Sequence, residues 1–94
     1  MHTKESIKDL LLRNDRAVER ALLAIYRRQT DAERQAERTV VHNGVGFNAF
    51  DARLGTYYAK WIGSGKNLTG THLDKGRRLA SKYVGQLVSI ANGG

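Results

Sequence analysis

The 94-residue sequence contains no cysteine and no proline. Without cysteine, disulfide bonds, thiolate nucleophiles and cysteine-ligated zinc or iron–sulfur sites are excluded. A chain that uses no disulfides suits a reducing compartment, so we expect a cytoplasmic protein. Without proline, helices must be ended by glycine or asparagine, or by the side chains around them.

Long hydrophobic runs are also missing. The sequence has no stretch of about 18 apolar residues, and its first residues, Met1–Glu5, lead into an amphipathic pattern rather than an apolar signal-peptide core. We therefore expect neither export nor a membrane partner. A chain of this length forms one domain with one small core, so self-association as a homodimer or larger homo-oligomer is a plausible way to bury more surface.

Acidic residues are scarce in the second half of the chain. Residues 1–42 carry nine basic and seven acidic side chains, whereas residues 43–94 carry seven basic and two acidic ones. An excess of positive charge attracts nucleic acid, acidic proteins or anionic lipid. The electrostatic signal therefore lies in the second half.

Apolar residues recur at helical spacing through most of the chain. Asn14-Asp15 interrupts the first stretch and can cap a helix, Thr30-Asp31-Ala32-Glu33 matches a capping box, and Gly63-Ser64-Gly65 can end a helix. The pattern predicts an all-α fold, a compact bundle of four to five helices with one irregular Gly-rich loop around residues 39–48 and room for two strand stubs near Val41. The expected helices cover residues 4–13, 15–28, 31–38, 49–62 and 70–91.

The helix expected over 49–62 carries most of the aromatic residues. Asn48 is its expected N-cap, and Phe47 can pack back on it as a hydrophobic staple. Its apolar side chains are expected in the core, except that one of two adjacent tyrosines, Tyr57 or Tyr58, must point outward and could stack on a base. The pattern consists of Phe50, Leu54, Tyr57, Tyr58, Trp61 and Ile62.

The last helix carries the clearest candidate site. Lys75, Arg78 and Lys82 stand at i, i+3 and i+7 and share one face, and Arg77 lies beside them. Lys60 and Lys66 could extend this face, and each basic side chain can pair with a phosphate. The alternative is an ordinary solvated face. In the first half, the arginines 13, 16, 20 and 27 are matched by acids at 9, 15, 19 and 37, which favours surface ion pairs.

The glycine-rich loop gives a weaker signal. Gly44-x-Gly46-x-x-Ala49 matches a loose form of the dinucleotide-binding fingerprint, but the chain has no room for the strands of that fold. A turn is the favoured interpretation, although the amides that open the next helix could hold a phosphate. The candidate loop contacts are Asn43, Gly44, Gly46 and Asn48.

Catalytic residues are not indicated. His2 is terminal, and His42 and His72 lie thirty residues apart without a carboxylate pattern, so neither a metal site nor a catalytic triad is predicted. A contact between His42 and Asp51 would be structural, with Asp51 in the first turn of its helix complementing the helix dipole. We expect a non-enzymatic protein without cofactor or metal.

Two strings resemble a pattern in short uncharacterised proteins of phages and mobile elements. They are Asn43-Gly44-Val45-Gly46-Phe47-Asn48-x-x-Asp51-Ala52 and Lys82-Tyr83-x-x-Gln86-Leu87, within residues 43–92. Similar sequences read Leu-Thr-x-x-Gln before the last helix, where this chain has Leu68-Thr69-Gly70-Thr71-His72. The resemblance implies a phage-like origin, work in DNA metabolism or against host defence, and the cytoplasm of a bacterial host. It transfers no catalytic residue.

Two functions remain open at this point. The first is nucleic-acid binding, to DNA rather than RNA, through the basic face of the last helix. The second is a protein-binding inhibitor or adaptor that acts on a host-defence or DNA-metabolism protein through an apolar patch or the same basic face.

Overall fold

The computed structural model describes residues 2–36 and 46–93, of which 30–36 are described as backbone only. These ranges contain five helices and no strand, so the predicted all-α fold is confirmed. The strand stubs expected near Val41 and the loop residues 37–45 lie outside the described residues. The helices are α1 (Lys4–Arg13), α2 (Asp15–Ala36), α3 (Ala52–Gly63), α4 (Gly70–Lys82) and α5 (Val84–Ala91).

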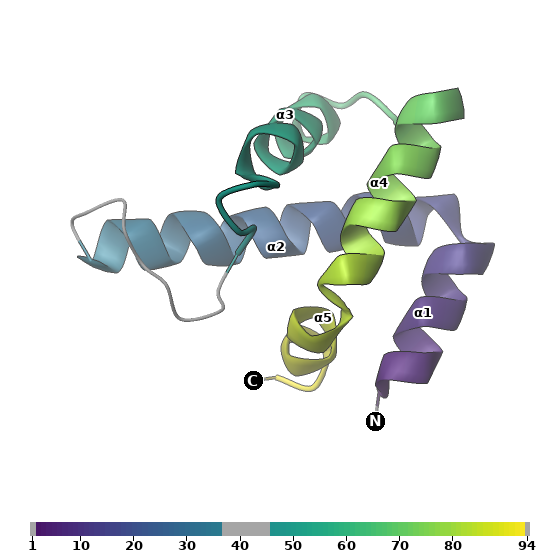
Figure 1. The fold of residues 1–94 in the computed structure, drawn as a ribbon, viewed down its shortest axis with the longest axis horizontal. Helices are drawn as coiled ribbons and strands as arrows, with labels where there is room; N and C mark the ends of the chain where they lie inside the picture. The colour runs from purple at the N-terminus through teal and green to yellow at the C-terminus, as the bar shows by residue number, and fades with distance from the viewer. Residues whose placement is uncertain (1, 37–45, 94) are drawn as a thin grey trace.

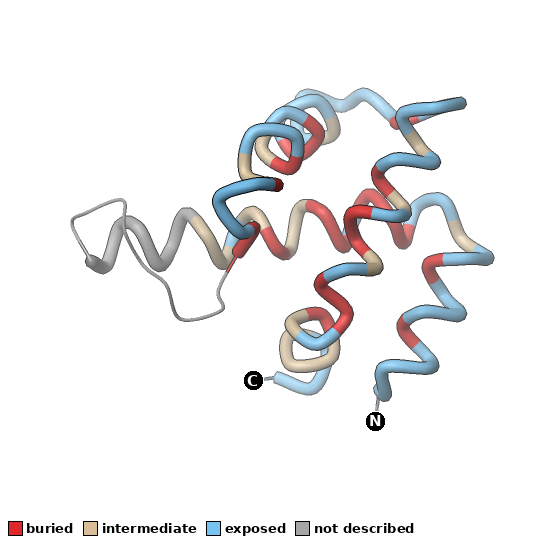
Figure 2. The backbone as a smooth tube through the Cα atoms, viewed as in Figure 1, coloured by how far each residue is buried: buried red, intermediate tan, exposed pale blue. Residues whose placement is uncertain are grey.

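Helix α2 is the scaffold on which the other helices pack. It runs along the long axis of the molecule, α3 packs on one side of it, and α4 crosses it toward its N-terminal end, while α1 and α5 lie next to each other on the side away from α3 (Figure 1). The buried residues line the inward sides of all five helices (Figure 2). Val18, Leu22 and Ile25 of α2 are fully buried at the centre.

The boundary between α1 and α2 follows the local sequence. Asn14 leaves the helical conformation, and its side-chain Oδ1 accepts hydrogen bonds from the backbone N–H groups of Arg16 (2.9 Å) and Ala17 (3.2 Å). These are two of the amides that a helix start leaves unpaired. The predicted cap is therefore confirmed. Asn92, near the end of the described chain, exchanges two hydrogen bonds with the backbone of His2, near its start.

The predicted break at Thr30 is wrong. Helix α2 continues through this residue to Ala36, so the helices expected over 15–28 and 31–38 are one element. Residues 15–36 contain neither glycine nor proline, and most of residues 30–36 are good helix formers. A capping box begins a new helix only if its first residue leaves the helical conformation. Nothing in this stretch forces Thr30 to do so.

Helix α3 begins three residues later than predicted. Asn48 accepts the backbone N–H of Asp51 on both its carbonyl (3.1 Å) and its side-chain Oδ1 (2.9 Å), so residues 48–51 form a turn before the helix. Asp51 is the N-cap residue rather than part of the first turn, and its side chain does not cap the helix. The helix ends at Gly63, as predicted, and Gly65 follows with a φ of +94°.

The predicted helix 70–91 is two helices. Tyr83 (φ −111°, ψ 24°) interrupts it, so that α5 turns away from the direction of α4. The Tyr83 ring packs edge-on against Phe47, with the ring centres 5.3 Å apart, and its hydroxyl reaches the turn before α3. Gly85 stands two residues beyond the break, and the tertiary contacts of Tyr83 lie at the break itself.

A close approach at Gly55 leads to a stability prediction. A Cβ atom added to Gly55 would lie 2.5 Å from the buried ring of Phe47, which confirms that Phe47 packs back on α3. Gly55→Ala is expected to lower the free energy of unfolding by about 2 kcal/mol, measured by urea unfolding, because overpacking outweighs the higher helix propensity of alanine. In the control Gly63→Ala, the added Cβ meets nothing within 4 Å, so stability should not fall. Equal effects of the two variants would contradict the packing at Gly55.

Within the described ranges, no helix is long and apolar enough to cross a membrane.

Candidate functional site

The predicted basic face of α4 is present, but it contains three residues rather than four. Lys75, Arg78 and Lys82 are exposed, and helical spacing places them together, away from the buried residues Gly76 and Leu79. We call these three residues the α4 basic face. They remain candidates for contact with a polyanion.

Arg77 lies on a different flank of α4 and holds the fold together. Its Nε donates to the carbonyl of Leu11 (2.8 Å), and its NH2 nitrogen forms an ion pair with Asp15 (2.5 Å). The Arg77 side chain is 21% exposed, and a weaker pair with Asp74 (3.6 Å) adds to these bonds. Arg77 thus connects α4 to the junction of α1 and α2, and we leave it out of the candidate interface.

The loop candidates also have structural partners where they are described. The amide and carbonyl of Gly46 both bond to the side chain of Gln86 (2.9 Å each), and the backbone N–H of Asn48 donates to the hydroxyl of Tyr83 (3.0 Å). Gly46 has a φ of +81° and packs against Gln29, so this position requires glycine. Asn43, Gly44 and His42 lie outside the described residues.

Asp51 is the centre of a buried polar network. Its carboxylate is 6% exposed and accepts hydrogen bonds from the Tyr83 hydroxyl (2.6 Å) and from Lys82 Nζ (2.8 Å to Oδ2). Burial alone raises the pKa of the Asp51 carboxyl, but the hydrogen bonds from Lys82 and Tyr83 and the charge of Lys82 outweigh it, so the pKa lies below its usual value. Burial and the bond to Asp51 raise the pKa of Tyr83 to about 12.

This network unites the two strings that carry the phage-type resemblance. In the first string, Gly46 bonds to Gln86 of the second string. Phe47 and Asn48 both contact Tyr83. Asp51 accepts hydrogen bonds from Lys82 and Tyr83. The described residues of the two strings therefore hold the start of α3 against the α4–α5 break.

The aromatic residues of α3 are the feature that sequence reasoning missed. The buried face of α3 is made by Gly55, Tyr58 and Ala59, whereas the expected core residue Phe50 is 89% exposed. Tyr57 points outward and Tyr58 inward, so one of the two tyrosines is exposed as predicted, but Trp61 and Leu54 are exposed as well. We give the name α3 stripe to four exposed residues, of which Phe50 lies in the turn before α3 and the other three lie on α3: Phe50, Leu54, Tyr57 and Trp61. Their sequence spacing of i, i+4, i+7 and i+11 was the signal that could have found them.

Basic side chains lie along the α3 stripe. Lys66 Nζ lies 4.3 Å from the centre of the Trp61 ring, and Lys82 Nζ lies 5.7 Å from the centre of the Phe50 ring. Arg53 and Lys60 are exposed on α3, four residues before and three after Tyr57, which makes them its neighbours on the helix surface. Because Lys82 also belongs to the α4 basic face, that face and the α3 stripe meet at this residue.

Acidic residues are absent from this part of the chain. The sequence has no Asp or Glu from Ala52 to Leu73, and the nearest acid before it, Asp51, is buried against Lys82. The positive charge around the α3 stripe is therefore not balanced by local carboxylates of α3 or of the segment that follows it.

A small hollow lies beside the Trp61 end of the stripe. It has a volume of about 100 Å³ and is lined by Tyr57, Tyr58, Trp61, His72 and the backbone segment Asn67–Thr69. The Tyr58 hydroxyl and His72 Nδ1 are 3.2 Å apart, and Trp61 Nε1 donates to the carbonyl of Asn67 (3.1 Å). Burial, together with neighbouring Tyr57, raises the pKa of Tyr58. These bonds hold the hollow between α3 and the start of α4.

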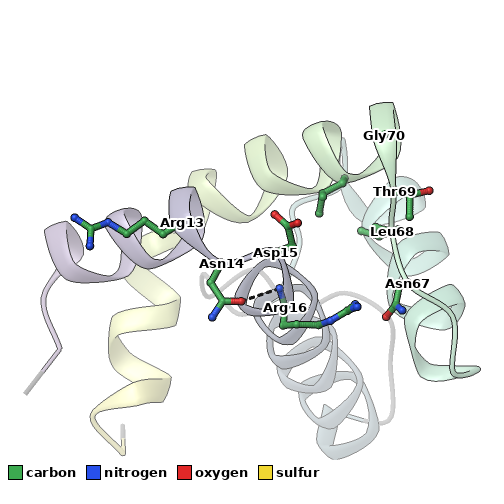
Figure 3. A pocket seen from close by; sticks show the side chains of 9 residues that line it. Arg13, Asn14, Asp15, Arg16, Asn67, Leu68, Thr69 and Gly70 are labelled. Atoms are coloured by element: carbon green, nitrogen blue, oxygen red, sulfur yellow. Dashed lines mark hydrogen bonds between the residues drawn. The ribbon is translucent and has the colours of Figure 1, made fainter.

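A larger open hollow lies where α2 and α4 begin (Figure 3). Its volume is about 620 Å³, and its charged lining residues already have partners: Arg13 pairs with Asp9, Arg16 with Glu19, and Asp15 with Arg77. Arg13 lies along α1 and points away from the other labelled side chains (Figure 3). The predicted ion pairs of Arg13 and Arg16 are thus confirmed, and this hollow offers little unpaired charge to a ligand.

A comparison of the chain with known protein families, with curated proteins and with solved structures found no match. The described residues contain no group of three or more His, Cys, Asp or Glu side chains that could hold a metal ion. The chemistry of the exposed surface is therefore the basis for a functional proposal.

Proposed function

We propose that this protein binds nucleic acid through the surface formed by the α3 stripe and the α4 basic face. The observation that carries the proposal is the acid-free stretch from Ala52 to Leu73, in which exposed basic side chains border exposed aromatic rings. Phosphates pair with the Lys and Arg side chains and release counterions, which supplies most of the affinity of such surfaces. DNA is the first ligand to test.

The affinity of this interface is expected to depend strongly on salt. About five cations in contact with phosphates give a slope near −3.5 for log K against log salt on a single strand, or about 100-fold weaker binding between 50 and 200 mM salt. Fluorescence anisotropy with labelled single-stranded and duplex DNA and RNA measures both the slope and the preference.

Matched charge reversals test where the nucleic acid lies. The triple variant Lys60→Glu, Lys75→Glu and Arg78→Glu should bind at least 30-fold more weakly at 50 mM salt and reduce the slope by about two to three. The control triple variant Lys4→Glu, Lys8→Glu and Arg20→Glu changes exposed residues of α1 and α2 and alters the net charge equally. Similar losses in both variants, or no binding by the wild type at 50 mM salt, would refute the proposed interface.

A protein-binding adaptor is the second candidate, and the α3 stripe is the observation that favours it. Exposed Tyr and Trp side chains are enriched at the centres of protein interfaces. An acidic partner surface would suit the same basic side chains. Retention of one stoichiometric partner after nuclease treatment, together with failure of the DNA and RNA titrations, would favour this function over the first.

A further inference from the structure

The α3 stripe exposes more aromatic surface than the fold explains. Phe50 is 89% exposed, although it is a large apolar side chain next to the buried Asp51. Tyr57 and Trp61 continue the row with ring centres 6.4 Å apart. Contiguous exposed apolar rows on small proteins usually mark a binding surface. The question is which ligand offers flat apolar faces and negative charge together.

Basic groups and rings alternate along the stripe. Tyr57 has Arg53 and Lys60 as its helix neighbours. Lys66 Nζ lies over one face of the Trp61 ring, and Lys82 Nζ, which also pairs with Asp51, lies over one face of the Phe50 ring, so the other face of each ring is the one for a base. A single-stranded nucleic acid repeats the same two chemistries, a flat base and a phosphate. If each ring stacks on a base and each basic side chain pairs with a phosphate, one single strand engages all of these groups.

A duplex would not use the rings in this way. Its bases already stack on one another and present only edges in the grooves, while its phosphates would reach the cations alone. The stripe would then face the charged backbone and lose water without gaining contact with bases. The α4 basic face suits either form of nucleic acid, so the α3 stripe is the part that discriminates between them.

We infer that the nucleic acid is single-stranded and that its unpaired bases stack on Phe50, Tyr57 and Trp61; this inference rests on the proposed function. The part of the row on α3 runs from Leu54 to Trp61, about 10 Å at the helical rise, with Phe50 in the turn before it. This helical part accommodates about three stacked nucleotides. The hollow beside Trp61 holds about three water molecules by volume and offers space for the edge of one base. Stacking carries no strong sequence preference.

Trp61 is the only tryptophan of the chain, so its fluorescence reports directly on the stripe. Titration with a ten-nucleotide oligo(dT) is expected to quench this fluorescence and to show at least tenfold tighter binding than a G·C-rich duplex of the same length that stays paired in the same buffer. The double variant Phe50→Ala and Tyr57→Ala should bind oligo(dT) at least about 30-fold more weakly, since each lost stacking contact costs about fivefold or more. Its salt slope should not change, because no cation is removed.

Leu12→Ala, which shortens an exposed apolar side chain on α1, is the matched control and should bind like the wild type. Circular dichroism checks that the double variant folds, which its exposed positions favour. If oligo(dT) and duplex bind equally and Trp61 fluorescence is unchanged, the stacking inference is overturned while the proposed function stands. If neither ligand binds, both fail. If Trp61 fluorescence instead depends on protein concentration alone, a second copy covers the stripe and the inference is also wrong.

Discussion

Asp51→Ala is expected to lower the free energy of unfolding by about 3 kcal/mol at pH 7. The substitution removes a buried acceptor that receives the Tyr83 hydroxyl (2.6 Å) and Lys82 Nζ (2.8 Å). Hydrogen bonds to charged groups contribute about 1.5–3 kcal/mol each to stability. A buried hydroxyl that loses its acceptor adds a desolvation cost of about 1–3 kcal/mol. Lys82 is half-exposed, so most of the loss comes from Tyr83 and from the turn before α3.

Urea unfolding measures this loss, and Asp9→Ala is the matched control. Asp9 also pairs with a basic side chain, Arg13 at 3.1 Å, but both partners are largely exposed. An exposed pair contributes about 0.2–1 kcal/mol, so the control should lose less than about 1 kcal/mol. Asp51→Asn keeps the shape and one acceptor oxygen and should fall between the two. Equal losses at positions 9 and 51 would show that the network around Asp51 does not stabilise the fold.

The same network gives the wild type a pH dependence of known sign. The pKa of Asp51 is lower in the folded state than its usual value of 3.8, so its stabilisation is present above pH 4 and is lost as the pH falls through the folded pKa. The pKa of Tyr83 is raised from 10.0 to about 12, so its stabilisation is complete below pH 10 and is lost as the pH rises toward 12. Asp51→Asn should flatten the acid side of the profile, and Tyr83→Phe the alkaline side.

Glu19→Ala should lower the free energy of unfolding by about 2–3 kcal/mol. Glu19 lies on α2, is 5% exposed, and its Oε2 accepts the buried backbone N–H of Leu68 at 2.7 Å. Its Oε1 also pairs with Arg16 (2.8 Å). Alanine would remove the hydrogen bond that joins α2 to the segment before α4 and would leave the Leu68 amide buried without a partner. A buried polar group that loses its partner carries the full cost of its desolvation.

Amide hydrogen exchange at Leu68 tests the role of Glu19 directly. In Glu19→Ala the Leu68 amide should exchange at least tenfold faster, because the opening of this segment becomes easier. Glu19→Gln retains an acceptor oxygen and should restore most of the protection, although it loses the charge that pairs with Arg16. Exposed Glu5 offers a control, and Glu5→Ala should leave exchange at Leu68 unchanged. Unchanged protection in Glu19→Ala would mean that the segment is held by packing of Leu68 alone.

Local sequence was a sound guide wherever a helix end has its own chemistry. Asn14 caps α2 because its short side chain reaches two first-turn amides, and Gly63–Gly65 ends α3 because glycine adopts a positive φ without strain. Where a cap competed with an uninterrupted run of helix formers, as at Thr30, the run prevailed. Whether a helix ends at these positions depends on residues only a few places away in the sequence.

The candidate site depended on packing instead. Helical spacing found the α4 basic face but placed Arg77 on it, since the partners that draw Arg77 inward, Leu11 and Asp15, are more than sixty residues away in sequence. The break at Tyr83 has the same character, because its ring and hydroxyl engage Phe47 and Asp51 more than thirty residues earlier.

Helix α3 shows most clearly what hydrophobic periodicity cannot predict. It is apolar on two sides, one with Gly55, Tyr58 and Ala59 and the other with the α3 stripe, and periodicity treats both as core. A single helix can bury only the side that meets its neighbours, and Gly55 lets Phe47 approach on the first of them. The sequence by itself determined the all-α class, the α1–α2 boundary, the start of α4 and the basic second half. The tertiary structure decided where the last helix breaks and which aromatic residues face solvent, because only the contacts of α3 with α2 and α4 choose between its two apolar sides.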